Sequence, residues 1–360
     1  MSDEKTFKIL SIDGGGIKGL YSLYVLREFE GRFCKEGETL SDYFDLICGT
    51  STGGLIALGI ATGHRVQEII DLYEKNVSVI FSRSDYWWPV QKVVNIYRGV
   101  AQLFGTRYSN VGLASKLDSF FGNLTLEDSR NLLCIPSFQL GTKMNVVFKC
   151  PYNATMVRDG RISMRDVALA TTSAPTYFAP HHLQTPHLGG YLVDGGVWAN
   201  DPSLAGIIEA LNSFVGGPAT TPGNELGFRY TGYEVLSIGN VRASTQPPVT
   251  APDQYWNILK FNSLIDLFMD GNENSIRHYC YVLCKATNGR LFRVEKTDYP
   301  YPDDVRMDNS DPRFLESLAT FGKSDGVRYG AMDEVARFFA TRKTYRTRWQ
   351  DRGPIDDVGL

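Results

Sequence analysis

Two glycine-rich turns constrain this chain most strongly, because each follows an apolar strand-like run and opens a helix-like run. The first is Asp13-Gly14-Gly15-Gly16-Ile17-Lys18-Gly19, which follows the β-rich segment 7–12. The second is Gly49-Thr50-Ser51-Thr52-Gly53, a G-x-S-x-G pattern that follows the apolar segment 44–48. In parallel α/β sheets, functional groups collect at the carboxyl ends of the strands, so we expect both turns at that edge of one sheet.

The rest of the chain alternates between strand-like and helix-like patterns. Further strands are predicted at 132–140, 145–150, 191–193 and 234–238. Helices are predicted at 20–33, 52–62, 66–80, 165–172, 204–214, 254–269 and 274–284. Such alternation indicates an α/β sandwich with a mainly parallel central sheet.

Composition narrows the classes of partner and compartment. The 360 residues carry a formal net charge of -3, and nucleic-acid binding depends on clustered positive charge, so we expect no nucleic acid polymer as a partner. The 6 cysteines are irregularly spaced, which indicates reduced thiols. Residues 1–8 are polar, and no apolar run approaches the roughly 20 residues of a membrane span. We therefore expect a cytoplasmic protein.

Two groups of side chains that are close in sequence could form a binding site for a metal ion or an anionic ligand. His278, Cys280 and Cys284 lie close in sequence, but their spacing matches no common zinc site, so we expect no metal and no other cofactor. Basic residues are also concentrated in the C-terminal stretch. They are explained either as the solvated face of a helix or as a surface that contacts anionic lipid head groups or a phosphorylated ligand. These basic residues are Arg337, Arg342, Lys343, Arg346, Arg348 and Arg352.

Ser51 has the setting of a nucleophile. Glycines on both sides leave its side chain exposed at a tight strand-to-helix turn, and the helix that begins at Thr52 points unpaired N–H groups toward it. The backbone N–H groups of Gly14, Gly15 and Gly16 can approach a tetrahedral oxygen closely. Each such oxyanion donor stabilises a transition state by about 3–4 kcal/mol.

The general base is harder to assign from sequence. Histidines 181, 182 and 187 lie in a Pro-rich loop, and His278 lies on an amphipathic helix, so surface roles explain all four. Asp194 instead follows the strand 191–193 and opens the turn Asp194-Gly195-Gly196. A carboxylate there can take the serine proton if burial raises its pKa. Taken alone, Asp194 is better explained as a turn aspartate that bonds its own backbone.

Two other site arrangements remain open at this point. An α/β-hydrolase triad in the order Ser51, Asp194 and His278 is compatible with the chain order, although Ser51 comes early for that fold. The glycines of the first turn also satisfy the dinucleotide fingerprint G-x-G-x-x-G. That fingerprint requires a second strand ending in an acidic residue about 20 residues later, where this chain is polar.

The segment 81–104 is rich in aromatic and aliphatic residues, among them Trp87 and Trp88. Adjacent tryptophans favour membrane interfaces because their rings are amphipathic. We weigh a lid or interfacial anchor against an ordinary core helix.

The three motifs together resemble the patatin-like phospholipases: Asp13 to Gly19, then Gly49 to Gly53, then Asp194 to Gly196. The resemblance implies a three-layer α/β/α sandwich, a Ser51–Asp194 dyad and an acyl-enzyme intermediate, with Gly14, Gly15 and Gly16 as the oxyanion loop. It implies a catalytic core over 7–205, with 206–360 packed on the same domain. It also implies an acyl hydrolase that cleaves fatty-acyl esters of membrane phospholipids.

More narrowly, the chain resembles bacterial patatin-like effectors of anti-phage signalling, which cyclic dinucleotides activate. This resemblance implies membrane phospholipids and a cyclic dinucleotide as partners, leaves a homo-oligomer open, and implies action at the inner membrane surface. A constitutive lipase or esterase without nucleotide control, and a non-catalytic nucleotide- or lipid-binding protein, are the alternatives.

Overall fold

The computed structural model describes residues 6–80, 110–153, 155–216, 230–243, 261–343, 345–346 and 353–354. The aromatic segment 81–104 lies outside the described residues, as do Arg348 and Arg352. The anchor hypothesis for Trp87 and Trp88 therefore stays a prediction.

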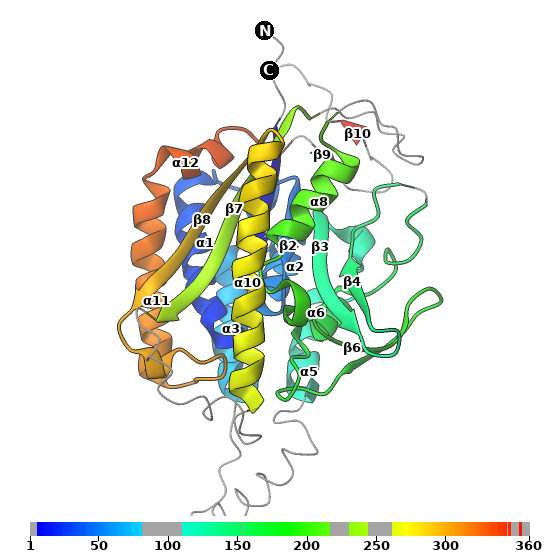
Figure 1. Ribbon diagram of the computed structural model, residues 1–360, viewed down its shortest axis with the longest axis vertical. Helices are drawn as coiled ribbons and strands as arrows, with labels where there is room; N and C mark the ends of the chain where they lie inside the picture. The colour runs from blue at the N-terminus through cyan, green and yellow to red at the C-terminus, as the bar shows by residue number, and fades with distance from the viewer. Residues whose placement is uncertain are drawn as a thin grey trace, which may run out of the picture.

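One mixed sheet forms the centre of the molecule, in the order β5-β6-β3-β2-β1-β7-β8, with β4 also paired to β3 (Figure 1). The run from β3 to β8 is parallel throughout, whereas β4, β5 and β6 add antiparallel pairs. The prediction of a mainly parallel central sheet is confirmed. The strands are β1 Thr6–Ile12, β2 Leu46–Gly49, β3 Leu132–Gln139, β4 Met144–Phe148, β5 His181–Gln184, β6 Gly189–Asp194, β7 Gly232–Ala243 and β8 Gly289–Tyr299, with a separate pair β9 Tyr345–Arg346 and β10 Gly353–Pro354.

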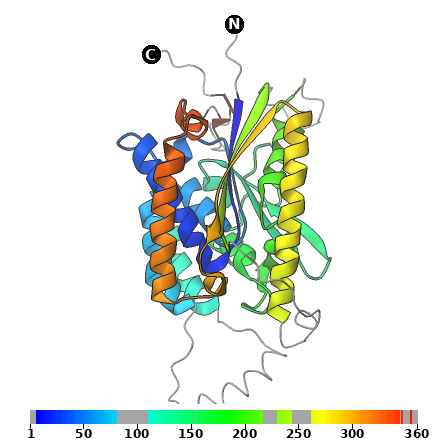
Figure 2. The same cartoon turned by 60° about the vertical axis from the view of Figure 1, so that its left-hand side comes forward.

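Helices cover both faces of this sheet, which confirms the three-layer architecture. In Figure 2 the sheet is seen nearly edge-on, with α1 and α11 on one side and α8 and α10 on the other. The helices are α1 Gly19–Phe33, α2 Thr52–Ala61, α3 Val66–Ile80, α5 Asn110–Phe121, α6 Met164–Thr172, α7 Gly196–Ala199, α8 Ser203–Ser213, α10 Phe261–Ala286, α11 Pro312–Gly330 and α12 Asp333–Ala336.

Two apolar clusters fill the spaces between the layers. Along β1, Phe7 and Ile9 pack in the cluster that includes residues of α8 and α10, while Leu10 and Ile12 pack in the cluster of α1 and α2. A strand buried on both faces needs apolar side chains at nearly every position, which explains the continuous apolar runs in the sequence. The same burial fixes where β1 and β2 end, and therefore where the two glycine turns lie.

Two local predictions are wrong. The chain from 261 to 286 forms the single helix α10, although the sequence pattern predicts a break between 269 and 274. Gly271 lies at that break, but an interior glycine costs a helix only about 1 kcal/mol, and the next turn is fixed by the buried, ion-paired Glu273. The segment His181–Gln184, predicted as a loop, forms β5 because its backbone pairs with β6.

The described part of the basic C-terminal stretch, up to Arg346, does not form one solvated helix face. The helix α12 ends at Ala336, Arg342 is ion-paired with Glu38, and Lys343 Nζ donates to the Arg130 carbonyl. Within the described ranges, no helix combines the length and the apolar character that a membrane span requires.

Candidate active site

Ser51 occupies a strained turn between β2 and α2. Its backbone has φ 55° and ψ -124°, a region that side-chain-bearing residues rarely adopt. The neighbouring Gly53 lies so close to the Ile12 carbonyl that a Cβ would clash with it. The Ser51 N–H donates to Thr171 Oγ1 at 3.0 Å. This geometry is that of a nucleophile elbow, in which a sharp turn presents the serine hydroxyl above the sheet.

Asp194 is the last residue of β6 and is 2% exposed. Its Oδ1 accepts the Gly196 N–H at 2.7 Å, an interaction that the following glycine turn makes available. Burial raises the pKa of the Asp194 carboxyl to about 6, although hydrogen bonding from Ser51 and Gly196 opposes this rise. Asp194 Oδ2 is buried and has no partner in full hydrogen-bonding geometry among the described residues. Ser51 is thus near enough to lower the pKa of the Asp194 carboxyl, although the two side chains do not form a full hydrogen bond in this structure.

The first glycine turn lies directly against Ser51, since a Cβ on Gly14 would be 3.2 Å from Ser51 Cβ. The Gly14 N–H donates to the Asn200 carbonyl at 2.9 Å and is therefore occupied. Gly15 and Gly16 donate from their N–H groups to no described residue in this structure. Gly16 has φ 56° and faces the Met307 carbonyl so closely that only glycine fits. The turn thus offers two free backbone donors beside the serine.

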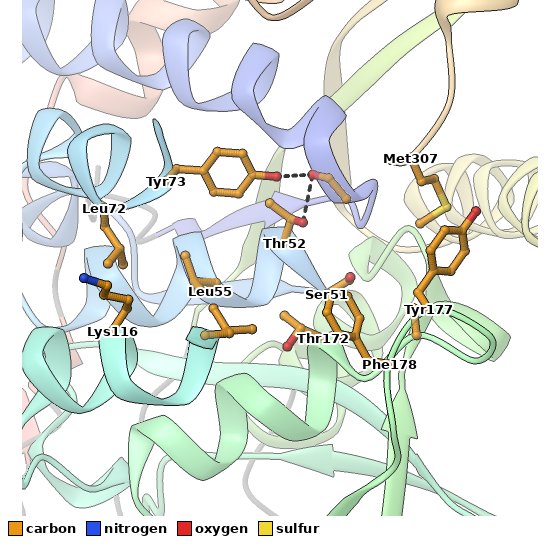
Figure 3. A pocket seen from close by; sticks show the side chains of 13 residues that line it. Ser51, Thr52, Leu55, Leu72, Tyr73, Lys116, Thr172, Tyr177, Phe178 and Met307 are labelled. Atoms are coloured by element: carbon orange, nitrogen blue, oxygen red, sulfur yellow. Dashed lines mark hydrogen bonds between the residues drawn. The ribbon is translucent and has the colours of Figure 1, made fainter. Parts of the chain in front are cut away.

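An apolar cavity opens from Ser51 along α2 (Figure 3). Its walls come from α2, α3, α5 and the segment after α6, and Lys116 and Leu72 lie at the end away from Ser51. Such a cavity suits an unbranched hydrocarbon chain, because most of the surface that its lining residues expose is apolar. The lining residues are Gly16, Ser51, Thr52, Leu55, Leu72, Tyr73, Leu113, Lys116, Thr172, Ala174, Tyr177, Phe178 and Met307.

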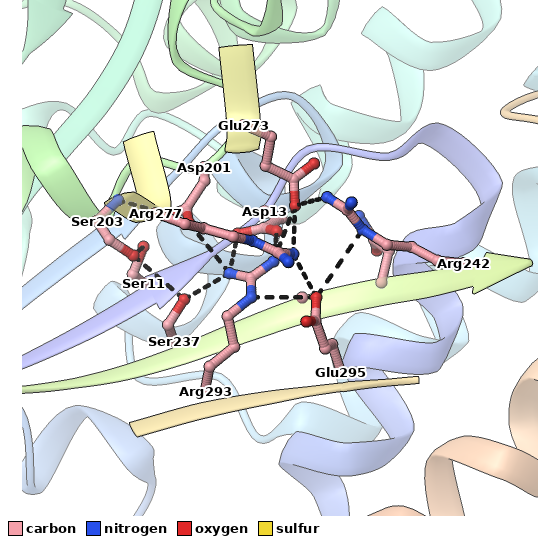
Figure 4. A network of polar contacts seen from close by, with 12 residues as sticks. Ser11, Asp13, Asp201, Ser203, Ser237, Arg242, Glu273, Arg277, Arg293 and Glu295 are labelled. Carbon is pink, nitrogen blue, oxygen red and sulfur yellow. Dashed lines mark hydrogen bonds and ion pairs between the residues drawn. The ribbon is translucent and has the colours of Figure 1, made fainter. Parts of the chain in front are cut away.

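A buried ion-pair network lies behind the glycine turn (Figure 4). At its centre, the Arg293 side chain of β8 contacts both carboxylate oxygens of Asp13 and lies 3.1 Å from Asp201 Oδ2. It also lies 2.9 Å from Glu273 Oε1 of α10. Burial would raise the pKa of the Glu273 carboxyl, but the surrounding arginines outweigh it and hold the pKa at about 2. The network therefore joins the ends of β1 and α7 to the C-terminal elements.

The histidines lie in other settings. His278 is exposed on α10 and does not line the cavity, and His181 Nε2 lies 3.1 Å from Asp166 Oδ1. The polar groups that act on Asp194 are those of Ser51 and Gly196, so the described residues give no support for a Ser51, Asp194 and His278 triad. Among the described residues, no group of three His, Cys, Asp or Glu side chains could hold a metal ion.

The structure brings together Ser51, Asp194 and the Gly14–Gly16 turn, as the motif order predicts. Sequence reasoning missed Asn200, Asn240 and Arg293, which surround that turn. These three residues lie in no recognisable sequence motif. They are related to the glycine turn only by their proximity to it in the folded chain.

Known proteins match either the motif-bearing part of this chain or nearly all of it. A family model described as patatin-like phospholipase matches residues 10–205, which contain all three motifs. A cGAMP-activated phospholipase of Escherichia coli (strain TW11681) is 28% identical over 355 residues, covering 94% of each chain. A cGAMP-activated phospholipase of Vibrio cholerae is 40% identical over 210 residues, covering 56% of this chain and 57% of the relative. Among solved structures, VipD from Legionella pneumophila matches 91% of this chain and 67% of its own, with 12% identity and a TM-score of 0.42.

Proposed function

The chain belongs to the patatin-like phospholipase family, and we propose that it hydrolyses fatty-acyl esters of membrane phospholipids with Ser51 as nucleophile and Asp194 as general base. The observation that carries this proposal is a buried carboxyl with a pKa of about 6 beside a strained serine, at the mouth of an apolar cavity. A base with a pKa near neutrality combines the deprotonated form with useful proton affinity.

The acylation step follows from these positions. Asp194 accepts the Ser51 hydroxyl proton as Oγ attacks the ester carbonyl, and the carbonyl electron pair moves onto oxygen. The resulting oxyanion accepts hydrogen bonds from the Gly15 and Gly16 N–H groups. The intermediate then collapses, the C–O bond to the glycerol oxygen breaks, and Asp194 returns its proton to that oxygen. An acyl-enzyme ester on Ser51 and a lysophospholipid are the products of this step.

Deacylation repeats the chemistry with water. Asp194 takes a proton from water, hydroxide adds to the acyl carbonyl, and collapse returns the proton to Ser51 as the fatty acid leaves. The apolar cavity holds the acyl chain throughout, because Leu55, Leu113 and Phe178 offer hydrocarbon contacts beside the serine. One carboxyl therefore serves both half-reactions, with no histidine between it and the serine.

Regulation is the second part of the proposal. The relative from Escherichia coli matches this chain almost end to end and is named for activation by cGAMP. We infer that a cyclic dinucleotide activates this chain too, and that it acts from the cytoplasm at the inner membrane surface. Constitutive activity is the competing function, and a nucleotide-free assay distinguishes the two.

Fatty-acid release from phospholipid vesicles tests both parts. The assay compares the wild type with Ser51→Ala, with and without cGAMP, and uses Ser119→Ala on the exposed face of α5 as the matched serine control. We expect release that needs both Ser51 and cGAMP, with Ser119→Ala equal to the wild type. Equal release without nucleotide would remove the regulation and keep the enzyme. Release that persists in Ser51→Ala would overturn the catalytic assignment.

A further inference from the structure

The Asn240 side chain holds the glycine turn in place through a hydrogen bond to the Gly14 carbonyl. It lies on β7, is 8% exposed, and its Nδ2 donates to the Gly14 carbonyl at 2.6 Å, across 226 residues of sequence. A carbonyl can only accept, so the amide nitrogen of Asn240 must be the atom that faces Gly14. Asn240 lies outside residues 10–205, the segment that matches the family model, whereas its partner Gly14 lies inside it.

The Gly14 carbonyl and the Gly15 N–H belong to one peptide unit. A trans peptide is planar, and its C=O and N–H point in opposite directions. Fixing the direction of the Gly14 carbonyl therefore fixes the direction of the Gly15 N–H as well. A hydrogen bond to the carbonyl also polarises the unit and makes its N–H a stronger donor.

The Asn240 side chain is itself held in place. It packs so tightly against Gly15 that a Cβ there would clash with the amide. On its other side, Ser22 Oγ lies 3.3 Å from Asn240 Oδ1 and donates to the Gly239 carbonyl at 2.9 Å. The Gly14 N–H is fixed as well, through the Asn200 carbonyl. Gly14 is thus held at its N–H and at its carbonyl by groups far away in sequence, and that carbonyl belongs to the peptide that carries the Gly15 N–H.

The neighbouring peptides of the turn are supported differently. The Gly15 carbonyl accepts the Lys18 N–H at 3.2 Å, so the turn itself orients the Gly16 N–H. The Ile17 N–H is occupied by the Met307 carbonyl at 2.9 Å and can donate to nothing else. Only the Gly14–Gly15 peptide combines a free N–H with a carbonyl held by a side chain.

We propose that Asn240 is a positioning residue for catalysis, which aims and polarises the Gly15 N–H toward the oxygen where negative charge develops. This proposal rests on the proposed hydrolase function. It gives the C-terminal part of the chain an indirect role in the reaction, through Asn240 of β7. Asn240 does not touch the substrate, so it acts on the rate through Gly15 alone.

The test compares Asn240→Ala and Asn240→Asp with the wild type on a short soluble ester, with cGAMP present throughout. The aspartate variant keeps the size of the side chain but cannot donate when ionised. Removing an oxyanion donor outright lowers kcat by about 100- to 1000-fold, so misdirecting one should lower kcat by about 10- to 100-fold. We expect KM within about twofold of the wild type, because the ground-state carbonyl uses this donor weakly.

Two further readouts separate positioning from a structural role. A trifluoromethyl ketone forms an oxyanion on the serine, so its affinity should fall in parallel with kcat/KM, whereas affinity for the fatty-acid product should not change. The apparent pKa of the pH–rate profile should stay at the wild-type value, because Asp194 is untouched. Tyr21→Phe is the matched control: it removes a buried hydrogen bond of 2.9 Å to Asp325 and should lower stability without lowering kcat.

The outcomes are decisive in each direction. A kcat within twofold of the wild type in both Asn240 variants would overturn the proposal, as would an unchanged affinity for the ketone. A loss of activity equal to the loss of folded protein would also overturn it. If one variant fails to fold, the other carries the comparison. Activity that persists in Ser51→Ala would instead show that the hydrolase assignment itself is wrong.

Discussion

At the scale of single residues, the site depends on one carboxyl that is buried almost completely. Asp194 has few polar neighbours, so its charged form loses hydration and its pKa rises to about 6. Had the same residue been exposed, its pKa would remain near the ordinary value and it would be a weak base. In the proposed mechanism, the burial of Asp194 at the end of β6 is therefore what activates the serine.

The pH dependence of the reaction follows from this pKa. Asp194 must be deprotonated to accept the serine proton, so kcat/KM should be constant above the pKa and fall about tenfold per pH unit below it. We expect the half-maximal value near pH 6 on a short soluble ester. A profile controlled by a group titrating above pH 7 would contradict the assignment of Asp194 as base.

Asp194→Asn should lower kcat by about 100- to 10,000-fold, because an amide cannot take the proton. The variant should fold, since the amide oxygen can still accept the Gly196 N–H and no buried charge is created. Kinetics on the short ester, together with thermal unfolding, check both statements. A variant that keeps a tenth or more of the wild-type kcat would show that another group acts as base.

The residues of the site fall into two groups: those that lie in a local sequence motif and those that reach the site only through long-range contacts. The placement of Ser51, Asp194 and the glycines beside one another was predictable, because each lies in a contiguous motif that itself determines a local turn. Asn240 and Arg293 were not, because their partners Gly14 and Asp13 lie 226 and 280 residues away. Side chains that fix a loop by contacts in space leave no local pattern.

At the scale of elements, the turns at the ends of β1, β2 and β6 create the site, and α2, α3 and α5 form the cavity beside it. Strands with buried, apolar sequences were predicted well. The strand β8 was missed because its sequence is polar and several of its side chains, including Arg293 and Glu295, enter the ion network. An edge strand with charged side chains gives no apolar pattern to recognise.

The cavity predicts the acyl-chain preference. Leu113→Phe should narrow the space beside α2, so that activity on long-chain esters falls at least about tenfold while activity on a butyrate ester is retained. Val327→Phe adds the same ring at a position on α11 that is 58% exposed, and it should change neither activity. Equal losses on long and short esters in Leu113→Phe would place the acyl chain elsewhere or indicate a folding defect.

At the scale of the whole molecule, one sheet includes both the motif-bearing strands and the C-terminal strands β7 and β8. The predicted division into 7–205 and 206–360 stays a prediction. The contacts nevertheless run across it, since Arg293 of β8 holds Asp13 and Asn240 of β7 holds Gly14. The resemblance over the first part of the chain could not predict these contacts.

The ion network should dominate the stability of this arrangement. Arg293→Met leaves the carboxyls of Asp13, Asp201 and Glu273 without their central partner, so it should destabilise the fold by about 3–5 kcal/mol. Lys75→Met removes an exposed pair with Asp71 and should cost less than about 1 kcal/mol. Urea unfolding measures both, and similar losses in the two variants would contradict a structural role for the network.

The central claim is that Asp194 activates Ser51, and covalent labelling tests it most directly. A fluorophosphonate is added with cGAMP present, the modified peptide is identified by mass spectrometry, and the labelling rate is followed against pH. We predict a single adduct on Ser51, a rate that falls below about pH 6, and labelling slowed at least about 100-fold in Asp194→Asn. An adduct on another residue, or an unchanged rate in Asp194→Asn, would contradict the account.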